Sequence, residues 1–287
     1  MRLQLPLALA ALALLAGCAA TPPPRPAMPA AAANDNLDAV AWAQTAIEHD
    51  LIYLQTYRDA QSRLLAALHD PRWDALTKED RTVPATGLPP AVVLDIDETV
   101  LDNSPYQARL VKSGGQYDEA SWAAWCKEER ARAMPGALAF TQFAAAHGIA
   151  VIYLSNRAQD LDTATLANLR RLGFPVSGPE AFLGLGTVLP GCEQVGTEKG
   201  CRRQLVGRKY RVLMQFGDQL GDFVDVVANT VAGRKQAITG YMSWVGTRWF
   251  VLPNPTYGAW EPALFNNDWS TPPARRRQQK LDALRYN

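Results

Sequence analysis

The sequence predicts an α/β fold in which a parallel sheet is flanked by helices and carries a small, largely helical subdomain on the substrate side. Three short, mainly apolar runs have the composition of buried strands, at residues 91–94, 149–154 and 211–216. The first two are each followed by a turn and a helical pattern, and two such units indicate parallel strands with crossover helices. Each run also ends abruptly in polar residues, so the polar groups are expected at one edge of the sheet.

Composition limits the classes of partner. The chain has 287 residues, of which 48% are hydrophobic, enough for a sizeable core. A net charge of +1 predicts no affinity for polymeric nucleic acid or for an anionic membrane surface. No internal repeat or second core pattern is present, so residues 36–287 are expected to form one domain with an insertion at about 102–134.

The first 17 residues have the order of an export signal. Arg2 precedes an apolar run at residues 3–15 that is too short to span a bilayer comfortably. The run ends in Leu15-Ala16-Gly17-Cys18, which resembles a bacterial lipobox and implies cleavage before Cys18 and lipidation of that cysteine. The alternative is an ordinary secretory signal with a chance cysteine.

Lipidation would make the protein a membrane lipoprotein. Among bacterial lipoproteins, the alanine that follows Cys18 favours the outer membrane, so we expect a lipid-anchored protein there, facing the periplasm or the surface. The Pro/Ala-rich stretch within residues 18–35 is then a semi-extended tether.

Export also sets the redox environment of the three remaining cysteines. An oxidising compartment permits a disulfide, and Cys192 and Cys201 are the pair expected, because they flank a short Gly-containing loop. Cys126 is left unpaired and is expected to be buried.

The other elements follow from periodicity and from turn residues. A long helix is expected at residues 37–69, ending before Asp70-Pro71. Further helices are expected at 137–147, 161–172 and 198–206, with a last strand at 248–252 and a loop at 253–261. Residues 175–200 read as irregular, and the basic cluster at 275–280 reads as a solvated helix face.

The first strand ends in Asp95, with Asp97 two residues on. Period-two geometry sends both carboxylates to one face, where they repel each other unless a cation or a proton lies between them. An Asp-x-Asp pair alone is more often an acidic turn than a site. The residues at the ends of the other two strands favour a functional site instead.

The other strand ends offer the groups that phosphoryl transfer requires. Ser155 and Asn156 follow the second strand, and Asp218 and Asp222 follow the third. Lys199 opens a helix and can place its ammonium group on a phosphate. A nucleophile, a cation and donors for the equatorial phosphoryl oxygens are therefore all available.

Asp95-Ile96-Asp97-Glu98-Thr99 resembles motif I of the haloacid dehalogenase (HAD) superfamily. The longer string to Tyr106 is similar to that of the class C nonspecific acid phosphatases, which are bacterial lipoprotein phosphatases and 5′-nucleotidases. Ser155 matches motif II of that superfamily, Lys199 matches motif III, and Asp218 with Asp222 matches motif IV. The resemblance extends over about residues 41–261.

This resemblance implies a HAD-like Rossmannoid fold and a mechanism. Asp95 would be the nucleophile that forms an aspartyl-phosphate, and Asp97 the general acid and base. Mg²⁺ would bridge Asp95, the backbone carbonyl of Asp97 and Asp218, with Asp222 in support. The residues that would hold the phosphoryl group are Ser155, Asn156 and Lys199, with Lys209 an alternative to Lys199 as the motif III lysine.

For the leaving group, Trp122 and Tyr257 resemble the aromatic pair that clamps substrate in the nucleotidase members; Trp125, Trp260 or simple core packing are the alternatives. The expected function is an exported Mg²⁺-dependent phosphomonoesterase acting on 5′-nucleotides and other phosphomonoesters. A phosphotransferase, a narrow sugar-phosphate phosphatase and a non-catalytic ligand-binding lipoprotein are the rivals. The resemblance also allows a homodimer.

Overall fold

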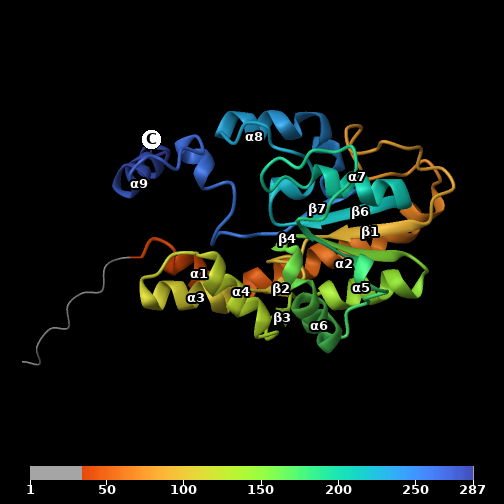
Figure 1. Cartoon of the computed structure of the whole chain (residues 1–287), viewed down its shortest axis with the longest axis horizontal. Coiled ribbons are helices and arrows are strands. Elements are labelled where there is room, and N and C mark those ends of the chain that lie inside the picture. The colour runs from red at the N-terminus through yellow and green to blue at the C-terminus, as the bar shows by residue number, and fades with distance from the viewer. Residues whose placement is uncertain (1–33, 287) are drawn as a thin grey trace, which may run out of the picture. The chain divides into compact units, whose positions relative to one another are not determined.

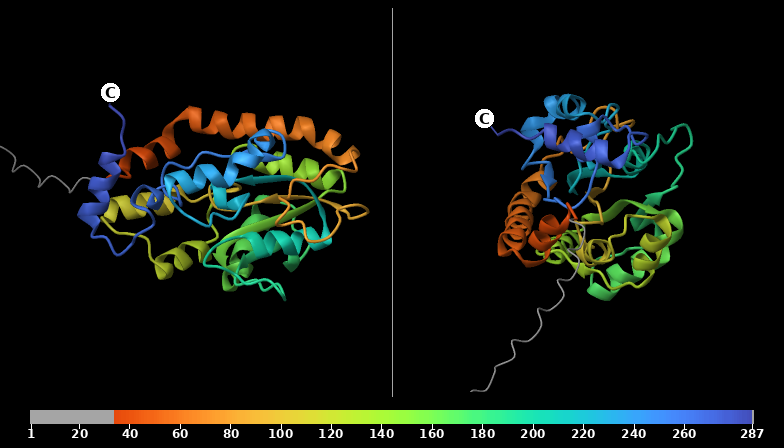
Figure 2. Two further views of the ribbon diagram at one scale, coloured as in Figure 1. Left: turned by 90° about the horizontal axis from the view of Figure 1, so that it is seen from above. Right: turned by 90° about the vertical axis from the view of Figure 1, so that its left-hand side faces the viewer.

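The computed structural model describes residues 34–286 (Figures 1 and 2). The predicted export signal, the lipidation site at Cys18 and nearly all of the tether lie outside the described residues. Within the described part no helix is long and apolar enough to cross a bilayer.

A five-stranded parallel sheet forms the centre of this part of the chain, which confirms the predicted α/β fold. Its strand order is β5-β4-β1-β6-β7, and every neighbouring pair is parallel. Because β1 lies between β4 and β6, the carboxyl ends of the three predicted strands are adjacent. The strands are β1 (Pro90–Leu94), β4 (Ala150–Ala158), β5 (Phe182–Leu185), β6 (Arg211–Gly217) and β7 (Trp249–Val251).

Helices cover both faces of the sheet, because the strands carry apolar side chains on both faces, as β1 illustrates. Its side chains alternate, so that Val92 and Leu94 join the core packed against α2 (Ile47–His69) and α5 (Ala137–Ala146). Ala91 and Val93 join the opposite core with α7 (Gly200–Lys209). Figure 1 shows α2, α5 and α6 (Asp162–Leu172) on one side of the sheet and α7 and α8 (Val231–Ile238) on the other.

The long helix expected at residues 37–69 is broken at Ala46 into α1 (Leu37–Thr45) and α2. Ala46 has an extended backbone, although alanine is the strongest helix former, so the break comes from tertiary packing. Helix α1 packs against α3 (Ser104–Ser113), while α2 packs against α5 and β6. The break thus lets one segment contact both the sheet and the insertion.

The expected insertion is a small helical subdomain. It consists of α3, α4 (Glu119–Lys127) and a short antiparallel pair, β2 (Leu101–Asp102) with β3 (Arg132–Ala133). It leaves the sheet directly after β1 and therefore lies beside the strand ends.

Two segments differ from the sequence expectation. The stretch expected to be irregular contains the edge strand β5, and β4 continues through residues 155–158 past a shift in its register with β5.

As expected, the basic cluster lies on a helix, α9 (Pro273–Asp282), where Arg275 and Arg277 are exposed. The remaining short 3₁₀ helices are Gln159–Leu161, Pro179–Ala181, Leu220–Asp222, Thr239–Trp244 and Pro262–Phe265.

A disulfide joins Cys192 and Cys201, the pair expected, and Cys126 is buried and free. The bridge closes a short loop that contains Lys199. Reducing it is expected to lower the free energy of unfolding by about 2–3 kcal/mol, because the unfolded chain regains the entropy of the open loop. Urea unfolding with and without dithiothreitol measures this, and a double Cys192→Ser/Cys201→Ser variant should no longer respond to the reductant. An unchanged urea midpoint on reduction would contradict it.

Candidate active site

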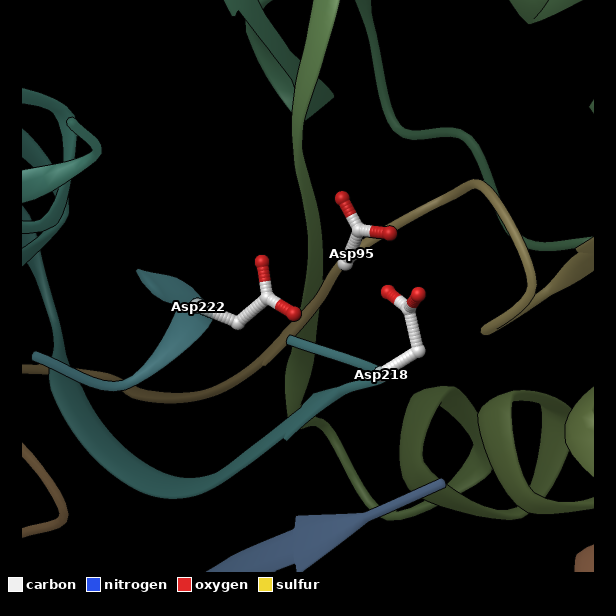
Figure 3. A group of neighbouring side chains, drawn as sticks. All are labelled: Asp95, Asp218 and Asp222. Carbon is white, nitrogen blue, oxygen red and sulfur yellow. The ribbon is translucent and has the colours of Figure 1, made fainter. Parts of the chain in front are cut away.

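Three carboxylates from two adjacent strand ends converge at the edge of the sheet (Figure 3). Asp95 follows β1, Asp218 follows β6, and Asp222 ends the 3₁₀ turn after β6. One oxygen from each lies within 4.8 Å of the other two. An all-oxygen set of this kind suits a hard divalent cation such as Mg²⁺, so the residues fit the metal that the sequence led us to expect.

The carboxylate oxygens of Asp95, Asp218 and Asp222 differ in the hydrogen bonds that they accept from the protein. Both oxygens of Asp222 accept hydrogen bonds, from Lys199 and from the Gln219 backbone. One oxygen of Asp218 accepts from Gln219 and Asn254, at 2.7 and 2.8 Å. Among the described residues, Oδ2 of Asp95 and Oδ1 of Asp218 accept none. These two oxygens are therefore the best placed for direct ligation, with Asp222 in a supporting role.

Lys199 supplies the cationic group of the site. Its Nζ donates to Asp95 Oδ1 at 2.5 Å and to Asp222 Oδ1 at 2.7 Å, and also to the carbonyl of Leu154 at 2.8 Å. It is only 4% exposed, at the start of α7. Lys209, the alternative considered from sequence, is exposed at the other end of that helix, so Lys199 is the lysine at the strand ends.

Burial dominates the electrostatics. It raises the pKa of the Asp95 carboxyl to about 7; Lys199 opposes the rise, and the charges of Asp222 and Asp97 add to it. Burial also raises the pKa of Asp218 well above its usual range, reinforced by Asp222 and Asp95. Burial disfavours the Lys199 ammonium, but Asp222 and Asp95 outweigh this and raise its pKa. In the described part of the chain, the three carboxyl groups of Asp95, Asp218 and Asp222 have one ammonium group, that of Lys199, to balance their negative charge. A bound cation would therefore be stabilised here.

The side chain of Asp97 stands apart from this carboxylate group. Its Oδ1 accepts hydrogen bonds from Arg157 Nε and from Asn103 Nδ2, each at 2.9 Å. Arg157 Nη2 forms an ion pair with the same oxygen at 2.8 Å. Its Oδ2 accepts from the Ser155 hydroxyl at 3.2 Å. Of the expected metal ligands, Asp97 could therefore contribute its backbone carbonyl, while its carboxyl is held apart from the other three carboxylates.

The residues expected to bind phosphate have unequal access. Ser155 is fully buried, and its hydroxyl lies between Asp97 and the backbone N–H of Arg157. Asn156 is exposed and lines the cleft, and its Oδ1 accepts from Arg202 Nη2 at 2.6 Å. Arg202 thereby fixes both the Asn156 side chain and, through the Ser155 carbonyl at 2.6 Å, the end of β4.

The strand ends open into a cleft of about 1150 Å³. Trp122 from α4 and Tyr257 from the loop after β7 both line it, as do Asp95, Asp97, Lys199 and Asp218. Trp122 belongs to an aromatic cluster, with ring centroids 5.1 Å from Tyr106 and 6.3 Å from Tyr117.

The alternative aromatic residues do not reach this cleft. Trp125 is buried, with its indole N–H donated to Asn103 Oδ1 at 2.8 Å. Trp260 is 38% exposed and does not line the cleft. The structure thus brings the expected pair, Trp122 and Tyr257, to the cleft that contains the strand-end carboxylates.

Sequence reasoning assigned no role to three buried polar residues of the site. Arg157 and Asn103 hold Asp97, and Glu98 accepts from the Tyr257 hydroxyl. The signal for Arg157 was its place two residues after Ser155 on the same strand, which sends both side chains to one face. No sequence signal indicated that Glu98 adopts a left-handed backbone, with φ of 54°.

Comparisons with known proteins agree with this geometry. A family model described as HAD superfamily, subfamily IIIB (acid phosphatase), matches residues 27–260. The chain is similar to the class C acid phosphatase from Bacillus anthracis with tungstate bound: 35% identity, TM-score 0.75, coverage of 88% of this chain and 97% of that one. A second structure of the Bacillus anthracis class C acid phosphatase matches at 34% identity with the same TM-score and coverage.

Curated relatives are more distant. The 31 kDa stem glycoprotein of Glycine max is 25% identical over 165 residues, and the 28 kDa stem glycoprotein is 26% identical over 166 residues. In each case the match spans 58% of this chain and 58% of the relative, which is less than two thirds of the relative's length.

Proposed function

The chain belongs to subfamily IIIB of the HAD superfamily, the acid phosphatases, and from this premise we propose that it is an exported Mg²⁺-dependent phosphomonoesterase that hydrolyses 5′-nucleotides and other organic phosphomonoesters. The main support for this proposal is that Asp95 and Asp97, two residues apart, contact different sets of side chains. Asp95 faces Lys199 and Asp218. Asp97 faces Arg157, Asn103 and Ser155.

We propose that these two aspartates divide the reaction. In the first step a carboxylate oxygen of Asp95 forms a bond to phosphorus, the bond to the ester oxygen breaks, and Asp97 donates its proton to the leaving oxygen. In the second step Asp97 takes a proton from water, and that water attacks the phosphorus of the aspartyl-phosphate. Inorganic phosphate leaves and Asp95 is regenerated.

Other residues bind and orient the phosphoryl group in this proposal. Lys199 donates to Asp95, Ser155 donates to Asp97, and Asn156 lines the same cleft. These three side chains would contact the equatorial oxygens. Mg²⁺ held by Asp95, Asp218 and the Asp97 carbonyl, with Asp222 behind, would supply the positive charge that offsets phosphate and carboxylate. The oxygen-only ligand set is the reason for naming Mg²⁺.

Cation binding should depend on pH in a defined direction. Asp95 has a pKa of about 7 without a cation, so below pH 7 a cation must displace its proton. Titration of Asp95 alone is therefore expected to lower the apparent affinity for Mg²⁺ on the order of tenfold per pH unit below pH 7, and the raised pKa of Asp218 acts in the same direction. Calorimetric Mg²⁺ titrations of EDTA-treated protein at pH 5, 6 and 8 measure this. Equal affinities at the three pH values would contradict it.

The aromatic pair in the cleft supports a flat leaving group. Stacking a base on an aromatic side chain is worth roughly 1–2 kcal/mol, so Trp122→Ala is expected to lower kcat/KM for AMP about 5–30-fold relative to glycerol 2-phosphate. Trp42→Ala, on α1 and outside the cleft lining, is the matched control and should leave the ratio unchanged. Equal losses on both substrates after Trp122→Ala would remove the support for a nucleotide preference.

A substrate panel decides between broad and narrow specificity. Release of phosphate from p-nitrophenyl phosphate, abolished by EDTA and restored by Mg²⁺, is expected of the proposed enzyme. A binding protein would release none. Comparable turnover of several nucleoside monophosphates supports the broad enzyme, whereas turnover of one sugar phosphate alone, or transfer to an acceptor alcohol instead of water, would replace it with one of the rivals.

Export and anchoring are proposed from the sequence alone. The mature chain would begin at Cys18, carry lipid on that residue and reach the outer membrane through the tether at residues 18–35. Cys18→Ser should abolish metabolic labelling with palmitate and release the protein from the membrane fraction. We also propose a homodimer from the family resemblance, and sedimentation equilibrium would return twice the chain mass if it forms.

A further inference from the structure

Trp122 and Tyr257, two of the aromatic residues that line the cleft, are each connected to one of two consecutive residues that follow β1, Asp97 and Glu98. On one side, Arg157 Cζ lies 5.5 Å from the centre of the Trp122 ring, and the same guanidinium binds Asp97. On the other side, the Tyr257 hydroxyl donates a hydrogen bond to Glu98 Oε2. Asp97 is thus linked through Arg157 to Trp122 of α4, and Glu98 is linked directly to Tyr257 of the loop after β7.

The backbone and the side chain of Glu98 are both held by hydrogen bonds. It is 5% exposed and has a φ of 54°, a left-handed conformation that a glutamate adopts only when its surroundings hold it there. Its Oε1 accepts from the backbone N–H of Asn103 at 2.8 Å, and its own N–H donates to the Leu101 carbonyl at 2.9 Å. The Tyr53 hydroxyl donates to the Glu98 carbonyl. The side chain therefore has a fixed position from which to hold Tyr257.

The backbone of the Tyr257 loop is attached to the same strand ends. Tyr53 also donates to the Pro253 carbonyl at 3.1 Å, and Asn254 Nδ2 donates to Asp218 Oδ2 at 2.8 Å. Gln219 Nε2 donates to the Tyr257 carbonyl at 3.3 Å. These bonds hold the loop but not the ring, and among the described residues the bond to Glu98 is the one hydrogen bond that the ring hydroxyl makes.

We propose that Glu98 is a positioning residue that fixes the Tyr257 ring in the cleft and thereby determines the preference for flat aromatic leaving groups. This inference rests on the proposed phosphatase function and goes beyond it. A ring held in one orientation can stack on a planar group without first losing rotational freedom, whereas an aliphatic leaving group gains little from it. Because Glu98 follows Asp97 directly, the ring is placed relative to the residue that protonates the leaving oxygen.

The test compares kcat/KM for AMP with kcat/KM for glycerol 2-phosphate. Glu98→Ala and Tyr257→Phe, which both remove the hydrogen bond, should each lower the AMP to glycerol 2-phosphate ratio about 5–30-fold, through a higher KM for AMP. The double variant should lose no more than either single one, since both break the same contact. Glu98→Gln keeps a polar group at each contact and should restore the ratio to within about twofold of the wild type.

A control variant separates this effect from the loss of a tyrosine–glutamate hydrogen bond elsewhere in the chain. The Tyr241 hydroxyl donates to Glu79 Oε2 at 3.0 Å outside the cleft lining, so Tyr241→Phe should leave the ratio unchanged. A Tyr257→Phe variant with the wild-type ratio, or with equal losses on both substrates, would overturn the role of Glu98. A wild-type enzyme that hydrolyses both substrates equally well would also overturn it. Absence of any phosphate release by the wild type would instead reject the proposed function, and this inference with it.

Discussion

Asp95→Asn is expected to reduce phosphate release on the order of 10⁴-fold or more, with the chain still folded. Asparagine has nearly the shape of aspartate, but its amide cannot attack phosphorus. Asp97 and its partners Arg157 and Asn103 stay in place, so the acid and base function is retained and only the nucleophile is removed. Phosphate release from p-nitrophenyl phosphate at saturating Mg²⁺ measures the loss.

The stability of this variant provides the folding control. Burial raises the pKa of Asp95 from 3.8 to about 7, so without a cation this residue contributes stability that is present below pH 3.8 and lost as the pH rises through 7. Asp95→Asn removes that loss, and its stability relative to the wild type should therefore rise between about pH 4 and pH 7. Asp59→Asn, at an exposed carboxylate on α2, should change neither activity nor this pH dependence. A folded Asp95→Asn variant with near-normal turnover would exclude the covalent mechanism.

The second large effect is expected at Lys199. Lys199→Ala removes the one ammonium group that contacts Asp95 and Asp222 within residues 34–286, and it leaves two buried carboxylates without their partner. Breaking a buried ion pair in this way costs roughly 3–5 kcal/mol. The loss should be largest in EDTA, because a bound cation would offset part of the uncompensated charge.

Lys209→Ala is the matched control for Lys199, since it removes an exposed lysine at the other end of α7. It should change stability by less than about 0.5 kcal/mol and leave KM unchanged. Urea unfolding in EDTA, together with the inhibition constant for inorganic phosphate, compares the two variants. Weaker phosphate binding in Lys209→Ala than in Lys199→Ala would reverse the assignment of the motif III lysine.

The centre of the site could be predicted because it depends on topology. The sequence shows where the strands end, and in a parallel sheet those ends lie together, so Asp95, Ser155 and Asp218 could be placed near one another without coordinates. The family model and the solved class C structures confirm the resemblance that motif I suggested. The pairing of Lys199 with Asp95 depends on contacts between residues far apart in the chain, and only the structure separates it from Lys209.

Other features could not be predicted because their causes are tertiary. The helix break falls at Ala46, where the local sequence favours an unbroken helix. Arg157 is 2% exposed, which is rare for arginine, and its partners Asp97 and Asn103 are more than 50 residues away. Glu98 adopts its left-handed backbone only because Tyr53, Asn103 and Tyr257 hold it.

The most direct test of Asp95 as the nucleophile is to trap the covalent intermediate. Protein mixed with AMP carrying a radioactive phosphate, in the presence of Mg²⁺, should be quenched in acid within a single turnover and digested. We predict label in the peptide that contains Asp95, lost on chasing with unlabelled AMP and absent from Asp95→Asn. Rapid phosphate release with no protein-bound label at any quench time, or label on a residue other than Asp95, would contradict this assignment.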